Sequence, residues 1–107
     1  MTEKTQSILA EFARRVRHAL GDRVRRIVLF GSHARGDARD YSDYDVLVVV
    51  DRRTPELHSA ILDIECELEE ESGAFISCFL RSESVYEANR RLGMPLYANV
   101  EAEGIAF

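Results

Sequence analysis

The sequence has none of the features that mark membrane or secreted proteins. In its 107 residues, no apolar run approaches the roughly 20 residues needed to span a bilayer. The N-terminal residues Met1 to Lys4 lack the basic-then-apolar pattern of a signal peptide, so we expect a cytoplasmic protein. There is also no internal repeat, low-complexity stretch or linker rich in proline and glycine. We therefore expect residues 1–107 to form one domain with no membrane partner.

Cysteine is scarce, and its placement argues against the common cysteine-based sites. The two cysteines, Cys66 and Cys78, form no CxxC motif and have no pair of histidines nearby. This is not the spacing of zinc ligands, and two cysteines do not make a disulfide framework. We expect both to be buried apolar side chains.

Lysine is almost absent, since 13 of the 14 basic residues are arginine. The formal net charge is −5, but residues 1–54 carry a net +3 and residues 55–107 a net −8. Two interpretations stay open: two solvated faces of opposite sign, or a basic half that holds an anionic ligand while the acidic half meets something else. The acidic total and the lack of an aromatic platform argue against nucleic-acid binding.

The hydrophobic pattern predicts an α/β (α+β) fold, a small mixed β-sheet flanked by helices. Apolar residues recur every four positions between Ile8 and Leu20, as on the buried face of a helix. Residues 44–50 are apolar on both faces, as in a central strand covered on both sides. The expected elements are a helix ending at Gly21, strands at 24–30 and 44–50, a helix from Thr54-Pro55 to Gly73, a strand at 74–80, a helix from the Ser84-x-x-Glu87 capping box to Leu92, helical turns at 95–103 and a strand at 104–107.

The helix expected after Thr54 carries an unusual concentration of acid. Three consecutive carboxylates, Glu69, Glu70 and Glu71, lie in its last turn, where the helix dipole disfavours negative charge. This local cost indicates that something cationic meets this end of the helix.

The segment between the first two expected strands suits an anion. Gly31 lets the backbone approach a ligand closely, and Ser32 is a suitable N-cap for a short helical turn. A helix N-terminus behind a glycine offers free N–H groups to a phosphate. Arg35 and Arg39 follow on the same loop, where they could add charge-assisted hydrogen bonds to phosphate oxygens.

Two carboxylates, Asp43 and Asp45, stand at the start of the second expected strand. Residues i and i+2 of a strand point to the same face, so these side chains should converge. Two adjacent anions need a cation to offset their repulsion, and hard oxygen ligands favour Mg²⁺ or Mn²⁺. A phosphate loop facing such a pair is typical of metal-assisted phosphoryl or nucleotidyl transfer.

The full segment resembles a known signature. Gly31-Ser32-x-Ala34-Arg35-Gly36-Asp37-Ala38-Arg39-x-x-Ser42-Asp43-x-Asp45 is similar to the signature of the minimal nucleotidyltransferases, in the DNA-polymerase-β-like superfamily. The resemblance implies a nucleotidyltransferase palm in which Gly31 and Ser32 hold the phosphates of a nucleoside triphosphate. It also implies that Asp43 and Asp45 bind the divalent metal and act in catalysis, while a hydroxyl attacks the α-phosphate and pyrophosphate leaves.

The resemblance also implies a partner. Family members of this size are often encoded beside an all-helical HEPN protein, and act as antitoxins, some by transferring AMP from ATP to a tyrosine of the HEPN toxin. We expect ATP as substrate, and a second chain, either another copy or a HEPN-type protein, to complete the acceptor pocket. The alternative is a module without catalysis that neutralises such a partner by binding alone, with the acidic helix at 55–72 as a docking face.

One expected feature of the family is missing. Active members hold a third carboxylate on a neighbouring strand that faces the aspartate pair. The corresponding strand, expected at 74–80, contains no Asp or Glu, and Ser77 or Cys78 falls at the position. The sequence leaves the choice between them open, because a one-residue slip of register exchanges the two faces of a strand.

Three ring-bearing residues near the signature have two interpretations each. His33 occupies a variable position, and faces either the nucleotide or the solvent. Tyr41 and Tyr44 flank the aspartate pair, where either could stack on a nucleotide base, although packing is the commoner role of a tyrosine.

Overall fold

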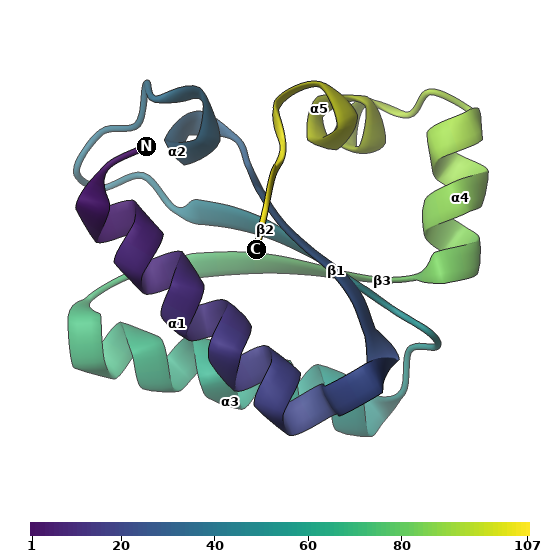
Figure 1. Ribbon diagram of the computed structural model, residues 1–107, viewed down its shortest axis with the longest axis horizontal. Coiled ribbons are helices and arrows are strands. Elements are labelled where there is room, and N and C mark those ends of the chain that lie inside the picture. The colour runs from purple at the N-terminus through teal and green to yellow at the C-terminus, as the bar shows by residue number, and fades with distance from the viewer.

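The computed structural model describes residues 1–107 and confirms the expected mixed fold (Figure 1). A four-stranded sheet is flanked by helices on both faces. The elements in chain order are α1 (Glu3–Leu20), a 3₁₀ turn (Gly21–Arg23), β1 (Val24–Phe30), α2 (Ser32–Arg35), β2 (Tyr44–Val50), α3 (Pro55–Ser72), β3 (Ile76–Ser82), α4 (Glu83–Arg91), α5 (Pro95–Glu103) and β4 (Ile105–Ala106). No helix is long and apolar enough to cross a membrane.

The sheet has the strand order β3-β2-β1-β4. β1 pairs antiparallel with β2 on one side and with β4 on the other, while β2 and β3 are parallel. Parallel neighbours require a crossover connection, and α3 supplies it. The C-terminal strand therefore lies beside β1, so that the last residues of the chain return to the strand that leads into the 31–43 loop.

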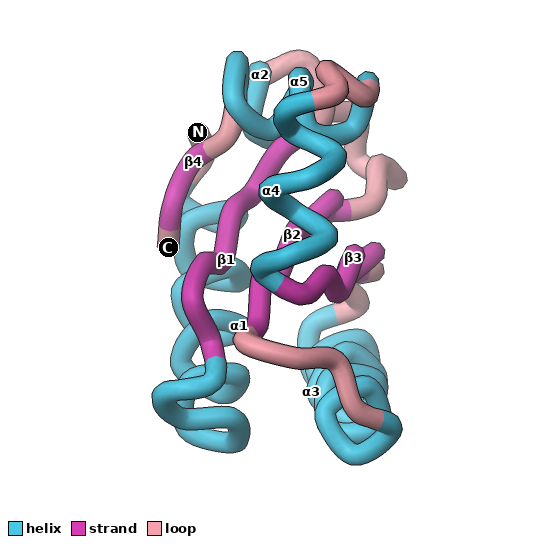
Figure 2. Tube along the Cα trace, turned by 90° about the vertical axis from the view of Figure 1, so that its right-hand side faces the viewer, coloured by secondary structure: helices cyan, strands magenta, loops and turns pink.

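Two apolar layers sandwich the sheet. One face packs against α1 and α3 through Val46, Val48 and Val50 of β2, among others. The other face packs against α4 and α5 through Leu47 and Val49 of the same strand. Figure 2 shows α4 in front of the strands, on the face opposite the α1 and α3 layer. The central strand is therefore buried on both sides, as its continuous apolar run predicts.

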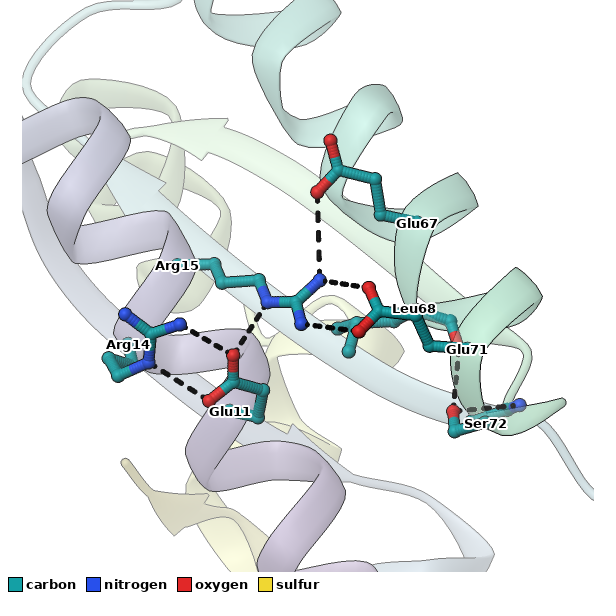
Figure 3. A network of polar contacts seen from close by, with 8 residues as sticks. Glu11, Arg14, Arg15, Glu67, Leu68, Glu71 and Ser72 are labelled. Carbon is teal, nitrogen blue, oxygen red and sulfur yellow. Dashed lines mark hydrogen bonds and ion pairs between the residues drawn. The ribbon is translucent and has the colours of Figure 1, made fainter.

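The predicted cation at the C-terminal end of α3 is Arg15 of α1 (Figure 3). Its two terminal nitrogens donate to the Glu71 carboxylate at 2.7 and 2.9 Å, and its Nε donates to Glu11 at 2.6 Å. Glu67 lies 3.6 Å from the same guanidinium. The hydrogen bond to Arg15 lowers the pKa of Glu71, so the acid at this helix end is partly offset within the chain.

Two local expectations were wrong in detail. The third strand runs from Ile76 to Ser82, two residues later than expected. Ser82, at the end of this strand, caps α4 by accepting from the Val85 N–H, whereas Ser84 lies inside the helix. The Ser84-x-x-Glu87 capping box is therefore not formed, because the pairing of β3 with β2 runs as far as Ser82 and places that hydroxyl at the helix start.

The prediction for the cysteines held only in part. Cys66 is exposed on α3, because it falls outside the stripe of buried residues that includes Ile64 and Leu68. Cys78 is half-buried and packs against the core shared with α1 and α3.

Candidate functional site

Gly31 joins β1 to α2 in a backbone conformation that favours glycine, with φ +80° and ψ −159°. A Cβ atom at this position would overlap Oδ2 of Asp45. The turn therefore passes directly against a carboxylate of β2. This close approach places the residue expected to hold phosphate beside one expected to bind metal.

Ser32 is the first residue of α2 rather than its N-cap, so the expected capping role was wrong. The cap residue is Gly31, whose carbonyl accepts from the N–H groups of Ala34 and Arg35 at 3.1 and 3.0 Å. The Ser32 hydroxyl does not cap the helix. The half-buried Ser32 side chain stands beside Gly31 with its hydroxyl not committed to the turn.

Asp43 and Asp45 lie at the start of β2, and the neighbouring strand β3 adds the hydroxyl of Ser77 beside Asp43. Ser77 pairs in register with Asp45, and its Oγ donates to Oδ2 of Asp43 at 3.2 Å. Burial raises the pKa of Asp45, and the negative charge of Asp43 raises it further. The pair therefore carries the electrostatic cost that a bound cation would relieve.

The register of β2 and β3 settles which residue stands at the third position. Ser77 shares the face of Asp45, whereas Cys78 pairs with Val46 on the opposite face. Burial raises the pKa of the Cys78 thiol, which keeps it protonated and unsuited to bind a metal. The position where the resemblance expects a carboxylate is therefore held by a neutral hydroxyl.

The side chains at this edge of the sheet fit a magnesium ion. Asp43 and Asp45 supply two hard carboxylate groups, and Mg²⁺ is commonly held by one or two carboxylates with water and substrate phosphates as the other ligands. No group of three or more His, Cys, Asp and Glu side chains suited to a metal occurs in the chain. Any metal at the pair would therefore depend on ligands from outside these side chains.

Arg35 and Gly31 both contact Glu103, a residue that the sequence analysis does not predict. The Gly31 N–H donates to Oε1 of Glu103 at 3.0 Å, and Arg35 Nη1 lies 3.2 and 3.3 Å from the two oxygens of that carboxylate. Arg35 also contacts Asp37 at 3.3 Å. Glu103 ends α5, and is separated from Gly31 by 72 residues, so no local spacing could have indicated it.

Arg39 is not brought together with Arg35. It is exposed and lines a separate hollow of about 460 Å³ with Lys4, Thr5 and His33, on the side of the loop that faces α1. Neither Asp43 nor Asp45 lines this hollow. The two arginines of the signature therefore stand on different sides of the loop.

His33 and Tyr44 hold the loop in place. Their rings stack with centroids 3.9 Å apart and an interplanar angle of 17°. His33 Nε2 lies 2.9 Å from the Ser42 carbonyl, and a carbonyl can only accept, so this nitrogen is the donor. Tyr44 is buried in the core, whereas Tyr41 is 80% exposed. His33 and Tyr44 thus have packing partners within the chain, and Tyr41 is the one free ring.

Comparison with known proteins agrees with this geometry. The family model for the nucleotidyltransferase domain matches residues 9–93. A protein of Methanocaldococcus jannaschii, provisionally named a protein adenylyltransferase, is 29% identical over 99 residues, which cover 92% of this chain and 93% of that protein.

Solved structures share the fold. A chain of a toxin–antitoxin complex with AMP-PNP superposes with a TM-score of 0.59 at 17% identity, covering 90% of this chain and 69% of that one. A chain from the complex of tri-AMPylated Shewanella oneidensis HEPN toxin with MNT antitoxin gives a TM-score of 0.54 at 16% identity, covering 94% and 69%. At these identities the likeness is one of fold.

Proposed function

Because the chain belongs to the nucleotidyltransferase domain family, we propose that it transfers AMP from ATP, with Mg²⁺, to a hydroxyl of a HEPN-type protein and thereby acts as an antitoxin. The observation that carries the proposal is the contact between the Gly31 turn and the Asp45 carboxylate. This contact sets the turn that carries the Gly31 N–H directly against the Asp45 carboxylate. The names of the adenylyltransferase relative and of the AMPylated HEPN complex support the choice of AMP and of the partner.

Each residue has a distinct part in the proposed reaction. The Gly31 N–H, the Ser32 hydroxyl and Arg35 hold oxygens of the β- and γ-phosphates. Asp43 and Asp45 hold the cation, which when bound offsets the charge on the phosphate oxygens. The acceptor oxygen bonds to the α-phosphorus as the bond to pyrophosphate breaks, and the pyrophosphate leaves with the bonding electrons.

Ser77 limits what the chain can do alone. A serine hydroxyl is neutral at physiological pH, and it cannot take the place of a third carboxylate as a general base or as a charged ligand. The proton of the acceptor hydroxyl must therefore pass to water or to a residue of the partner. This requirement fits a domain whose acceptor pocket is completed by a second chain.

The test is transfer of label from α-labelled ATP to a HEPN-type partner protein. With Mg²⁺, the wild-type chain should label the partner, and Asp43→Asn should reduce the labelling by at least about a hundredfold. Asp40→Asn is the matched control, because it removes the same charge from an exposed position on the same loop. Labelling that survives Asp43→Asn, or that never appears with the wild type, would overturn the proposal.

The neutral Ser77 favours a second candidate function, in which the chain neutralises the partner by binding alone. The two differ in one result. Under binding alone, Asp43→Asn should still form the complex and still suppress the partner's toxicity in cells. Under AMP transfer, the variant should form the complex but lose the suppression. The acidic face of α3 is a weaker docking surface than its composition indicates, because Arg15 already pairs with Glu71 and lies near Glu67.

A further inference from the structure

Glu103 stands where a phosphate group would be expected. Its carboxylate accepts the Gly31 N–H at 3.0 Å and lies within 3.3 Å of the Arg35 guanidinium. A backbone N–H and a guanidinium are the donors that recognise phosphate oxygens, and a carboxylate offers them the same acceptor atoms and negative charge. The side chain of Glu103 is only 20% exposed, whereas that of Arg35 is 47% exposed, so an anion from solvent can reach the guanidinium.

The backbone around Glu103 is held firmly in this place. Gly104 packs so closely that a Cβ there would overlap the Val100 carbonyl and the Val28 side chain. Directly after it, β4 pairs with β1, and the Phe107 N–H donates to the Ile27 carbonyl at 2.9 Å. The fold of the C-terminal segment therefore fixes the backbone of Glu103 beside Gly31, and only its side chain is free to move.

We propose that Glu103 is an internal stand-in for a phosphate group, which the nucleotide must displace from Gly31 and Arg35 before it can bind. The inference rests on the proposed function, because it assumes that the Gly31 loop receives the triphosphate. Since α5 is anchored by the buried Tyr97 and Val100, only the Glu103 side chain swings away, and α5 stays in place.

This arrangement makes Glu103 a threshold for anion binding at the Gly31 loop. Each anion that enters must offset the loss of two charge-assisted contacts within the chain. When a single phosphate displaces Glu103, it makes the same contacts that the carboxylate made, so the net gain in binding free energy is small. The cost of displacing Glu103 is the same for each anion, so the triphosphate with its cation, which gains contacts beyond the two that Glu103 uses, still binds where a single phosphate binds too weakly to matter.

The test is the affinity of the full chain for ATP with Mg²⁺, measured by calorimetry on the wild type and on Glu103→Gln. The glutamine keeps the size of the side chain and one acceptor oxygen but removes the charge, so we expect a Kd about five- to tenfold lower. Tripolyphosphate, which has no base or ribose, should show the same shift. Glu70→Gln, an equal charge change at an exposed position of α3, should leave the Kd unchanged.

The outcomes separate this inference from the proposed function. If the wild type binds ATP and Glu103→Gln binds it equally or more weakly, Glu103 positions Arg35 instead of competing with phosphate, and the inference alone is overturned. If neither protein binds ATP or tripolyphosphate at millimolar concentration, the proposed function falls together with the inference. Glu103→Ala, which removes the carboxylate altogether, should also lower the Kd. If the glutamine variant does not fold, the Kd of Glu103→Ala tests the inference by the same criterion.

Discussion

Gly31 links the two halves of the candidate site at the scale of a single residue. Its backbone conformation is one that side-chain-bearing residues rarely adopt, and its missing Cβ leaves the space that Asp45 fills. The sequence predicts both residues, because a glycine after a strand and an Asp-x-Asp at the next strand are local patterns. It could not predict Glu103, whose contact with Gly31 depends on where the last helix docks.

Replacement of Gly31 by alanine should disrupt the site beyond the cost of backbone strain. Gly31→Ala should lower the free energy of unfolding by about 2 kcal/mol or more, since strain of roughly 1–3 kcal/mol adds to the overlap with Asp45. Because the added Cβ would displace the Asp45 carboxylate, AMP transfer should fall at least about tenfold. Chemical denaturation and the α-label assay measure the two effects.

Gly73→Ala is the matched control for this substitution. Gly73 ends α3 at φ +74°, but a Cβ there would meet no atom within 4 Å. We expect this variant to lose only about 1 kcal/mol of stability from backbone strain and to keep its transfer activity. Equal losses of activity in the two variants would show that the Gly31–Asp45 contact has no special role.

At the scale of elements, the amphipathic helices were the most predictable part of the chain. The apolar stripe of α1 and the Thr54 cap of α3 are local signals, and both helices form close to the expected residues. The predicted start of β3 and the predicted cap of α4 were wrong, because the pairing of β3 with β2 decides where β3 begins and ends. The choice between Ser77 and Cys78 also needed the register, which only the folded sheet defines.

The contact between α1 and α3 makes a testable prediction at this scale. Arg15→Met should lower the thermal midpoint by a few degrees, because it leaves Glu71 without its bidentate partner while it keeps the apolar stem. Arg14→Met is the control, since Arg14 contacts only Glu11 on its own helix. Thermal denaturation followed by circular dichroism, at low and at high salt, measures both variants.

The salt dependence separates the two arginines further. The difference in thermal midpoint between Arg15→Met and Arg14→Met should shrink in high salt, because the pairs of Arg15 with Glu71 and Glu67 are partly exposed and are screened. Identical midpoints at low salt would contradict a role for Arg15 in holding the two helices together.

At the scale of the whole molecule, the candidate site is built from both ends of the charge-divided chain. The basic half supplies the loop with Gly31 and Arg35, and the acidic half supplies Glu103, which reaches that loop from the end of α5. The opposite charges of the two halves therefore meet inside one chain, both here and between α1 and α3. The sequence shows how the charge is divided between the two halves. Only the fold shows that some acidic residues of the second half pair with basic residues of the first.

The reaction class can be tested most directly by comparing two labels on the same substrate. The wild-type chain is incubated with the proposed HEPN-type partner, Mg²⁺ and ATP labelled at either the α- or the γ-phosphate. Nucleotidyl transfer predicts that the α-label becomes protein-bound and that the γ-label is released in pyrophosphate. Protein-bound γ-label, or label from neither position, would contradict the proposal that this chain transfers AMP.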